Sequence, residues 1–249
     1  MELKNLIAQS ETVDVYKCGD MAVKVFKKGA PKTLVLYEAL THARVEETGL
    51  PVPKIHEVSI MEDGRWAIQM ELVEGKTLAE IMKEDTANTS KYINDMVELQ
   101  LQVHLKKMPL LNKLKDKLHS QIEELDCLDD VKKYDLLTRL DSMKKHNKLC
   151  HGNFSPENII INDNGTFIVD WVAAAQGNAS ADVAKTYLLL ALNDPASAEL
   201  YMNLFCEKTS TSKKYVQEWL PIVAAAQLTE GKEEQKELCM KWLDVVDYE

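Results

Sequence analysis

The sequence predicts an α+β fold of two unequal lobes, a small β-rich N-terminal lobe and a larger, mainly helical C-terminal lobe. Short segments rich in β-forming residues dominate up to about residue 72, interrupted by a single helical pattern. Beyond residue 75, apolar residues recur three or four positions apart, which is typical of helices packed on a core. We therefore expect lobes at residues 1–75 and 76–249, joined by a short hinge at residues 71–75.

The N-terminal lobe is expected to contain four strands and one helix. The strand predictions, from β-branched and aromatic content between turn residues, cover residues 12–16, 21–26, 54–60 and 65–72. Helical spacing of apolar residues predicts a helix over residues 34–47, which Gly49 and Pro51 end.

The C-terminal lobe is expected to be helical apart from one hairpin. Thr77 and Glu80 fit a capping box before the first helix. Apolar spacing predicts further helices around residues 92–103, 111–125 and 131–140, with Pro109 ending the first of these. The turn signal Asn-Asp-Asn-Gly at 162–165 predicts a hairpin between apolar runs at 159–161 and 167–169. The rest is expected to be helical from residue 182, with a kink at Pro221.

The composition excludes several classes of protein. Forty acidic against thirty basic residues give a net charge of −10 without a Lys/Arg-dense tract, which argues against nucleic-acid binding. The apolar runs are too short to cross a bilayer and the first residues do not resemble a signal peptide, so we expect a soluble protein without membrane association. Five cysteines without a Cys-x-x-Cys pair argue against disulfides and zinc and favour the cytoplasm.

The predicted hairpin carries the first candidate site. Asn158 stands just before its first strand, and Asp170 stands at the end of its second strand. Because a hairpin brings these two ends together, an amide and a carboxylate oxygen could converge on one Mg²⁺ ion. A polar turn followed by an exposed strand-end aspartate explains the same spacing equally well.

Lys24 is the second candidate. Strand alternation places it on the same face as Ala22 and Phe26, which is unusual for a solvated lysine. A surface lysine that extends its amine to solvent is an equally good explanation for the residue taken alone. Glu38, on the predicted helix that follows, is a candidate ion-pair partner.

Taken in order, these features resemble the aminoglycoside phosphotransferase and choline kinase-like family, small-molecule kinases with a protein-kinase-like fold. The resemblance extends over almost the whole chain. It rests on Ala-Val-Lys-Val-Phe at 22–26, Gly-Leu-Pro-Val-Pro at 49–53, Met-Glu-Leu-Val-Glu-Gly-Lys-Thr-Leu at 70–78, His-Gly-Asn-Phe at 151–154 with Asn158, and Val-Asp-Trp at 169–171 with Gly177 and Asp182.

The resemblance implies an ATP-dependent kinase that moves the γ-phosphate to a hydroxyl of a small molecule. Lys24, oriented by Glu38, would hold the α- and β-phosphates. The backbone from Glu71 to Val73 would meet the adenine. The N-terminal lobe would therefore bind the nucleotide.

The resemblance also implies the metal ligands and the catalytic loop. Asn158 and Asp170 would bind the Mg²⁺ that bridges the phosphates. His151 would brace the catalytic loop, and Asp182 would anchor that loop from the neighbouring helix in a structural role.

The sequence departs from the family pattern at two places. Residues 9–16, where the family's loop covers the phosphates, contain no glycine, which predicts a stiffer or more open cover. Asn153 replaces the aspartate that would accept the hydroxyl proton, and an amide cannot take a proton near neutral pH. Loss of a general base costs on the order of 10²–10⁴ in rate, so nucleotide binding is expected to survive even if turnover does not. Glu157 is a nearby candidate for a replacement base.

Three hypotheses follow from these features. The first is a small-molecule kinase, and the second is a nucleotide-binding pseudokinase or regulatory protein without turnover. The third is an interaction module that docks through acidic segments at 121–130 and 230–249. For a kinase, the net charge favours a cationic acceptor such as an amino sugar. The four tryptophans could instead form a choline-type cage, although tryptophans are more often part of the core.

Overall fold

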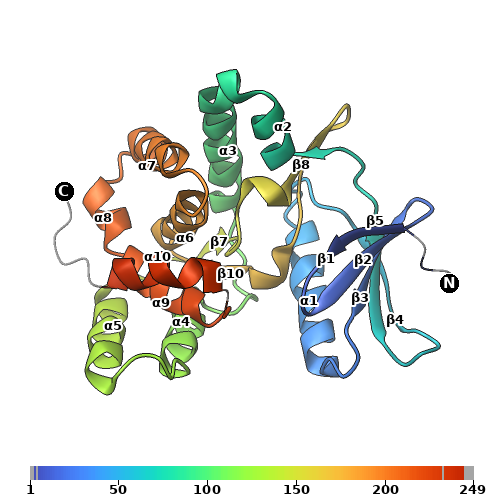
Figure 1. The fold of residues 1–249 in the computed structure, drawn as a ribbon, viewed down its shortest axis with the longest axis horizontal. Helices are drawn as coiled ribbons and strands as arrows, with labels where there is room; N and C mark the ends of the chain where they lie inside the picture. The colour runs from blue at the N-terminus through green and yellow to red at the C-terminus, as the bar shows by residue number, and fades with distance from the viewer. Residues whose placement is uncertain (1–2, 4, 232, 244–249) are drawn as a thin grey trace. The chain divides into compact units, whose positions relative to one another are not determined.

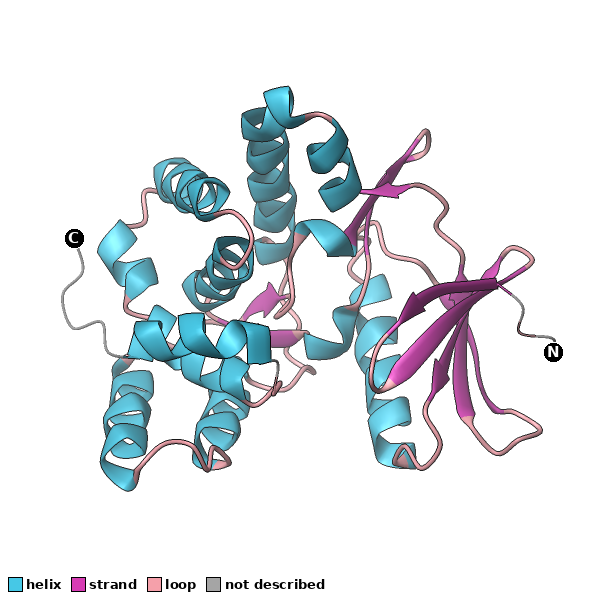
Figure 2. Ribbon diagram, in the orientation of Figure 1, coloured by secondary structure: helices cyan, strands magenta, loops and turns pink. Residues whose placement is uncertain are grey.

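The structure is a computed structural model that describes residue 3, residues 5–231 and residues 233–243. The chain forms two compact units, which are the described residues of Met1–Ile81 with Glu157–Val172, and of Met82–Pro156 with Ala173–Glu249. The first unit carries an antiparallel sheet and the second is mainly helical, which confirms the predicted α+β class (Figure 2).

A five-stranded antiparallel sheet forms most of the first unit (Figure 1). Its strands run in the order β1-β2-β3-β5-β4. They are β1 (Asn5–Gln9), β2 (Val13–Cys18), β3 (Met21–Phe26), β4 (Ile55–Ile60) and β5 (Trp66–Glu71). The four predicted strands are confirmed, and β1 is an addition. All five residues of β1 are exposed, so it lacks the apolar alternation by which a half-buried strand is recognised.

Strand β3 is buried on both faces. On one face, Phe26 packs with residues of helix α1 (Lys32–Glu46) and with Ile68 of β5. On the other face, Val23 and Val25 pack against Ala67. The predicted alternation along this strand is therefore confirmed, and it places Lys24 on the face that α1 covers.

A second, three-stranded sheet joins the hinge to the hairpin, in the order β6-β8-β9. The predicted hairpin is confirmed as β8 (Ile159–Asn162) and β9 (Gly165–Ile168), and β6 (Lys76–Thr77) pairs with β8. Gly75 allows this close approach, because a Cβ atom at this position would lie 2.5 Å from the carbonyl oxygen of Ile161. This pairing explains why the compact units do not divide at residue 75: residues 76–81 and the hairpin belong to the first unit.

The second unit is a bundle of helices with one short two-stranded sheet. The helices are α3 (Thr89–His104), α4 (Leu114–Glu123), α5 (Asp130–Ser142), α6 (Ala179–Ala191), α7 (Pro195–Thr209), α8 (Lys213–Gln217), α9 (Leu220–Leu228) and α10 (Glu233–Leu243). The short strands β7 (Lys148–Cys150) and β10 (Ala175–Gly177) pair antiparallel. Helix α2 (Leu78–Glu84) precedes the bundle, and the Thr77–Glu80 capping box at its start is confirmed by reciprocal hydrogen bonds.

Helix α9 lies in the middle of this bundle, in contact with α4, α6 and α10. Eight of its nine residues are buried, as expected for a helix that is apolar all round. The predicted kink at Pro221 is wrong. Pro221 lies in the first turn of α9, where a proline starts a helix because its missing N–H would have no intrahelical partner.

The expectation that Pro109 ends the helix through residue 103 is also wrong. Helix α3 ends at His104, because the chain turns there and Lys107 forms a β-bridge with Lys148. The helices predicted at residues 111–125 and 131–140 are confirmed as α4 and α5.

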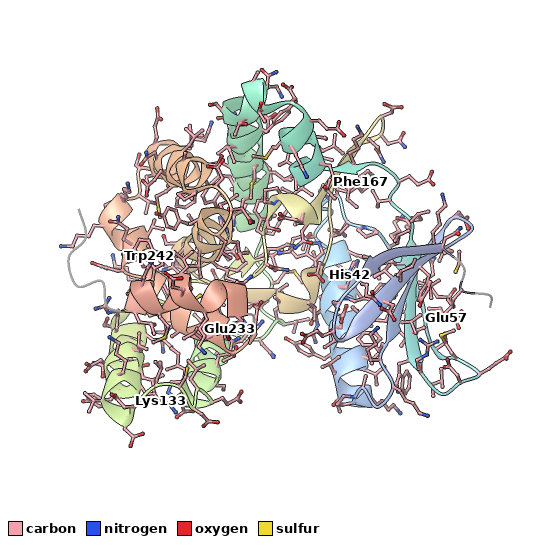
Figure 3. The ribbon with its side chains drawn as sticks, in the orientation of Figure 1. His42, Glu57, Lys133, Phe167, Glu233 and Trp242 are labelled. Carbon is pink, nitrogen blue, oxygen red and sulfur yellow. The ribbon has the colours of Figure 1, made fainter. Side chains whose placement is uncertain are left out.

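Helix α10 closes the described part of the second unit. Trp242 lies on α10 (Figure 3). Its ring packs edge-on against the ring of Tyr187, with centroids 5.8 Å apart. The acidic segment 230–249, one of the two proposed docking faces, lies partly outside the described residues. Within the described residues, no helix is both long and apolar enough to cross a membrane. The cytoplasmic location stays a prediction from the sequence.

Candidate active site

A cavity of about 450 Å³ lies within the first unit. It is lined by β1, β2, β3, α1, the hinge and both ends of the hairpin. Seven candidate site residues from the sequence lie in its wall, namely Lys24, Glu38, Glu71, Val73, Asn158, Asp170 and the candidate replacement base Glu157. The volume falls within the roughly 300–1,000 Å³ typical of small-molecule sites.

Lys24 forms an ion pair with Glu38 at the inner wall of this cavity. The two side chains are only 11% and 10% exposed. Asp170 Oδ1 lies 3.5 Å from the Lys24 ammonium. Burial alone would lower the pKa of Lys24, but the charges of Glu38 and Asp170 outweigh it and hold the pKa above its ordinary value. Lys24 is therefore held as a charged ammonium in the wall of the cavity.

Asn158 and Asp170 meet where the hairpin begins and ends. The carbonyl oxygen of Asn158 accepts a hydrogen bond of 3.0 Å from the N–H of Val169, the residue before Asp170. Asp170 has a φ of +63°, a left-handed conformation that few non-glycine residues adopt. An amide and a carboxylate oxygen suit a hard cation, so these two side chains fit Mg²⁺. Among the described residues, no group of three or more His, Cys, Asp or Glu gathers as a metal cage.

The hinge forms another wall of the cavity. The N–H of Leu72 donates to the carbonyl oxygen of Asp20 at 3.1 Å, and that of Glu71 donates to Lys54 at 2.9 Å. Among the hydrogen bonds of the described residues, none uses the N–H of Val73. This N–H is the backbone donor that a bound heterocycle at the hinge could use.

The β1–β2 turn contributes Ser10 to the cavity wall. The Ser10 hydroxyl accepts hydrogen bonds from the N–H groups of Thr12 at 3.3 Å and Val13 at 3.1 Å. A phosphate at this turn would have to compete with the hydroxyl for the same donors. This arrangement favours a stiff turn, one of the two forms expected from the missing glycine.

The other two sequence-predicted site residues, His151 and Asn153, belong to the second unit. His151 is fully buried, and its Nδ1 accepts a hydrogen bond of 3.1 Å from the N–H of Asn153. Its ring packs edge-on against Phe154, with centroids 5.8 Å apart. Gly152, between His151 and Asn153, has a φ of +78°, and a Cβ atom at this position would lie 2.6 Å from the carbonyl oxygen of Ala173.

Asp182 holds this loop from α6, as expected. Its Oδ1 accepts from the N–H of Gly152 at 2.7 Å, and its Oδ2 accepts from that of His151 at 3.2 Å. Burial alone would raise the pKa of Asp182. Hydrogen bonds from His104 and Gly152 outweigh this effect and keep the pKa below its ordinary value, so the carboxylate stays charged.

Sequence reasoning missed the partners that α3 supplies to Asp182. His104 Nε2 lies 2.9 Å and Gln100 Nε2 lies 3.0 Å from Asp182 Oδ2. Their spacing of four residues places them on one helix face, which is the only signal that the sequence offers. Lys117 of α4, which donates to the carbonyl oxygen of Ala173, was also missed.

The phosphotransferase enzyme family matches residues 7–206 of the chain. No curated protein matched the sequence.

Solved structures with the same fold include several small-molecule kinases. A thermostable mutant of aminoglycoside phosphotransferase APH(4)-Ia, in ternary complex with AMP-PNP and hygromycin B, has a TM-score of 0.73 at 12% identity, over 98% of this chain and 92% of that chain. Aminoglycoside 2'-phosphotransferase-IIIa with GDP has a TM-score of 0.63 at 16% identity, over 98% and 92%. Amicoumacin kinase hAmiN with AMP-PNP, Ca²⁺ and Ami has a TM-score of 0.65 at 10% identity, over 96% and 86%.

These likenesses establish the fold. The α+β architecture, with a small β-rich N-terminal lobe and a larger helical C-terminal lobe, is that of the aminoglycoside phosphotransferases and their kinase-like relatives. The match of residues 7–206 covers most of the chain. The chain therefore belongs to the phosphotransferase enzyme family.

Proposed function

We propose that the chain binds a purine nucleoside triphosphate with Mg²⁺ in the cavity of the first unit and transfers the γ-phosphate to a hydroxyl of a small molecule. The observation that carries this proposal is the buried Lys24–Glu38 pair, in the wall of the same cavity as Asn158 and Asp170. A lysine fixed by a glutamate, with an asparagine and an aspartate for the metal, matches the requirements of kinase-type phosphoryl transfer.

The phosphate end of the nucleotide would lie at Lys24. Its ammonium is fixed by Glu38 and would neutralise charge on the α- and β-phosphates. Asn158 and Asp170 would hold Mg²⁺, which, when bound, neutralises the charge that develops on the phosphate oxygens. The ion pair keeps Lys24 in place before the nucleotide arrives, so little reorganisation is required on binding.

The base of the nucleotide would lie at the hinge, where the N–H of Val73 is a donor for a ring nitrogen. ATP is the expected nucleotide. APH(4)-Ia binds AMP-PNP, whereas the aminoglycoside 2'-phosphotransferase was solved with GDP, so ATP and GTP should both be tested.

The acceptor would be a hydroxyl-bearing small molecule, in keeping with hygromycin B in the complex of APH(4)-Ia. The net charge of −10 is the argument for a cationic acceptor, an amino sugar or a choline-like compound. A tryptophan cage for choline finds little support, because Trp171 and Trp219 are 1% and 0% exposed.

A nucleotide-binding protein without turnover is the second candidate function, and Asn153 favours it. The amide can accept a hydrogen bond from the acceptor hydroxyl and orient it, but it cannot take the proton. Positioning and charge stabilisation, which carry most of phosphoryl transfer, would be intact.

Calorimetry with Mg-AMP-PNP and Mg-GMP-PNP, followed by an assay of ADP or GDP release with a panel of hydroxyl compounds, separates the two candidates. Turnover by the unmodified chain supports the kinase. Binding without turnover, together with a gain of about 10²–10⁴ in Asn153→Asp, supports the non-catalytic alternative. If neither nucleotide binds, or if Lys24→Met binds as tightly as the unmodified chain, both candidates fail.

A further inference from the structure

The second unit contains a small cavity beside the catalytic loop. It has a volume of about 60 Å³, and its walls come from α4, α6, α9, Ala173 and the loop residue Gly152. Roughly 10–15 Å³ is enough to hold one water molecule, so there is room for a group of several heavy atoms. Gly152 immediately precedes Asn153, so the cavity lies next to the place where an acceptor hydroxyl would be oriented.

Lys117 of α4 lies in the wall of this cavity and has few partners. Its ammonium donates one hydrogen bond of 3.2 Å, to the carbonyl oxygen of Ala173. Among the described residues, no carboxylate lies within 4.0 Å of it. An ammonium has three N–H donors, so two remain for a ligand. Burial lowers the pKa of Lys117, the nearby charge of Lys185 lowers it further, and the charge of Glu230 opposes this shift.

The acidic residues of the cavity are already engaged. Glu230 lies 3.1 Å from the Lys185 ammonium. The oxygens of Asp182 accept from two loop N–H groups and from two side chains of α3. The cavity wall thus holds two ammonium groups and two carboxylates. Glu230, Lys185 and Asp182 already have partners, whereas the Lys117 ammonium keeps two N–H donors for a ligand.

We propose that this cavity binds an anionic group of the acceptor, a carboxylate or a phosphate, through Lys117 and Lys185. The acceptor would then be a hydroxyl compound with a negative group, held so that its hydroxyl reaches Asn153. This inference rests on the proposed function, because only a phosphotransferase has an acceptor to place there. It reverses the cationic acceptor expected from the net charge, since a cation would meet the Lys117 ammonium, whose two remaining N–H donors require an acceptor.

Titration of the full chain with inorganic phosphate and with sodium acetate, at constant ionic strength, tests the site. Millimolar binding of either anion is expected, and the stronger of the two identifies the group. Lys117→Met should weaken this binding about tenfold or more, whereas Lys117→Arg, which keeps the charge, should retain most of it. Choline chloride serves as the probe of opposite charge and should show no dependence on Lys117.

Lys115→Met is the matched control. Lys115 is on the same helix, and its ammonium also donates to backbone carbonyls, those of Asp141 and Met143 at 3.1 Å each, but it lies outside this cavity. Its removal should leave anion affinity unchanged. Lys185→Gln gives a second variant in case Lys117→Met does not fold, and it should also weaken anion binding.

A crossed measurement separates this inference from the proposed function. Lys24→Met should abolish Mg-AMP-PNP binding and leave phosphate binding intact, and Lys117→Met should do the reverse. Three outcomes would overturn the anion site. The first is phosphate binding that depends on Lys24 alone, and the second is anion affinity that is unchanged in both Lys117→Met and Lys185→Gln. The third is the absence of binding by either anion. Absence of Mg-AMP-PNP binding, with Lys117-dependent phosphate binding preserved, overturns only the proposed function.

Discussion

The Lys24–Glu38 pair should behave as one energetic unit in a double-mutant cycle. Lys24→Met leaves the Glu38 carboxylate, which is only 10% exposed, without its cation. Breaking a buried ion pair from one side costs about 3–5 kcal/mol, and we expect the lower end because Asp170 is 33% exposed and stays hydrated. Glu38→Gln should cost less, about 1–2 kcal/mol, because Lys24 keeps Asp170 at 3.5 Å and gains an amide acceptor.

The double variant Lys24→Met with Glu38→Gln leaves no buried charge in the pair. Its loss of unfolding free energy should therefore be smaller than the sum of the single losses, by about 2 kcal/mol. Urea unfolding of the four proteins measures this coupling. Lys24→Met should also lower the Tm by about 6–12 °C, at about 2–4 °C per kcal/mol for a chain of this size.

The Lys17–Glu74 pair is the matched control, because its side chains are 39% and 69% exposed. Its coupling should stay below about 1 kcal/mol. Single losses at Lys24 and Glu38 that add to within about 0.5 kcal/mol would refute the reasoning. The pKa of Lys24 is raised in the folded chain. The contribution of Lys24 to the free energy of unfolding should therefore be constant up to about pH 10.5, the ordinary pKa of lysine, and disappear as the pH rises further.

Three further variants test the loops. Asp182→Asn should lower the free energy of unfolding, measured in urea at pH 7, by about 3 kcal/mol. Because the pKa of Asp182 is lowered in the folded chain, the unmodified chain should keep this extra stability above pH 3.8, the ordinary pKa, and lose it as the pH falls further. Ser10→Ala frees two N–H donors of the β1–β2 turn and should tighten Mg-AMP-PNP binding about two- to tenfold by calorimetry. Gly152→Ala should lower the Tm more than Gly231→Ala, because both have positive φ but only the first would meet another atom, the Ala173 carbonyl oxygen. Equal Tm losses would contradict this account.

Local patterns in the sequence predicted most helices and strands, because the formation of a helix or strand depends largely on residues that are close in the chain. Alternation placed Lys24 on the face that α1 covers, and the Thr77–Glu80 spacing identified a helix start that the hydrogen bonds confirm. Strand β1 gave no such signal because none of its side chains is buried. The effect of Pro221 was misjudged for another reason: the same residue kinks a helix interior but starts a helix at its first turn.

The candidate site could be predicted from sequence only where a turn brings its residues together. Asn158 and Asp170 meet across a hairpin, so their proximity follows from the turn signal between them. Lys117 could not be recognised, since its environment depends on Ala173, 56 residues later, and on Lys185. Side chains that converge through tertiary packing carry no mark in the local pattern.

The first unit retains features that cost stability, and this argues for ligand binding more than for structure. A buried ion pair such as Lys24–Glu38 is often replaceable by apolar residues without loss, so packing alone gives no reason for it. Asp170 has a φ of +63°, and backbone in sparsely populated regions costs about 1–3 kcal/mol. The ion pair and the strained Asp170 both line one cavity. Their cost in stability is offset if this cavity binds phosphates and Mg²⁺. We expect Asn153 to limit proton transfer, so nucleotide binding should persist whether or not the chain turns over.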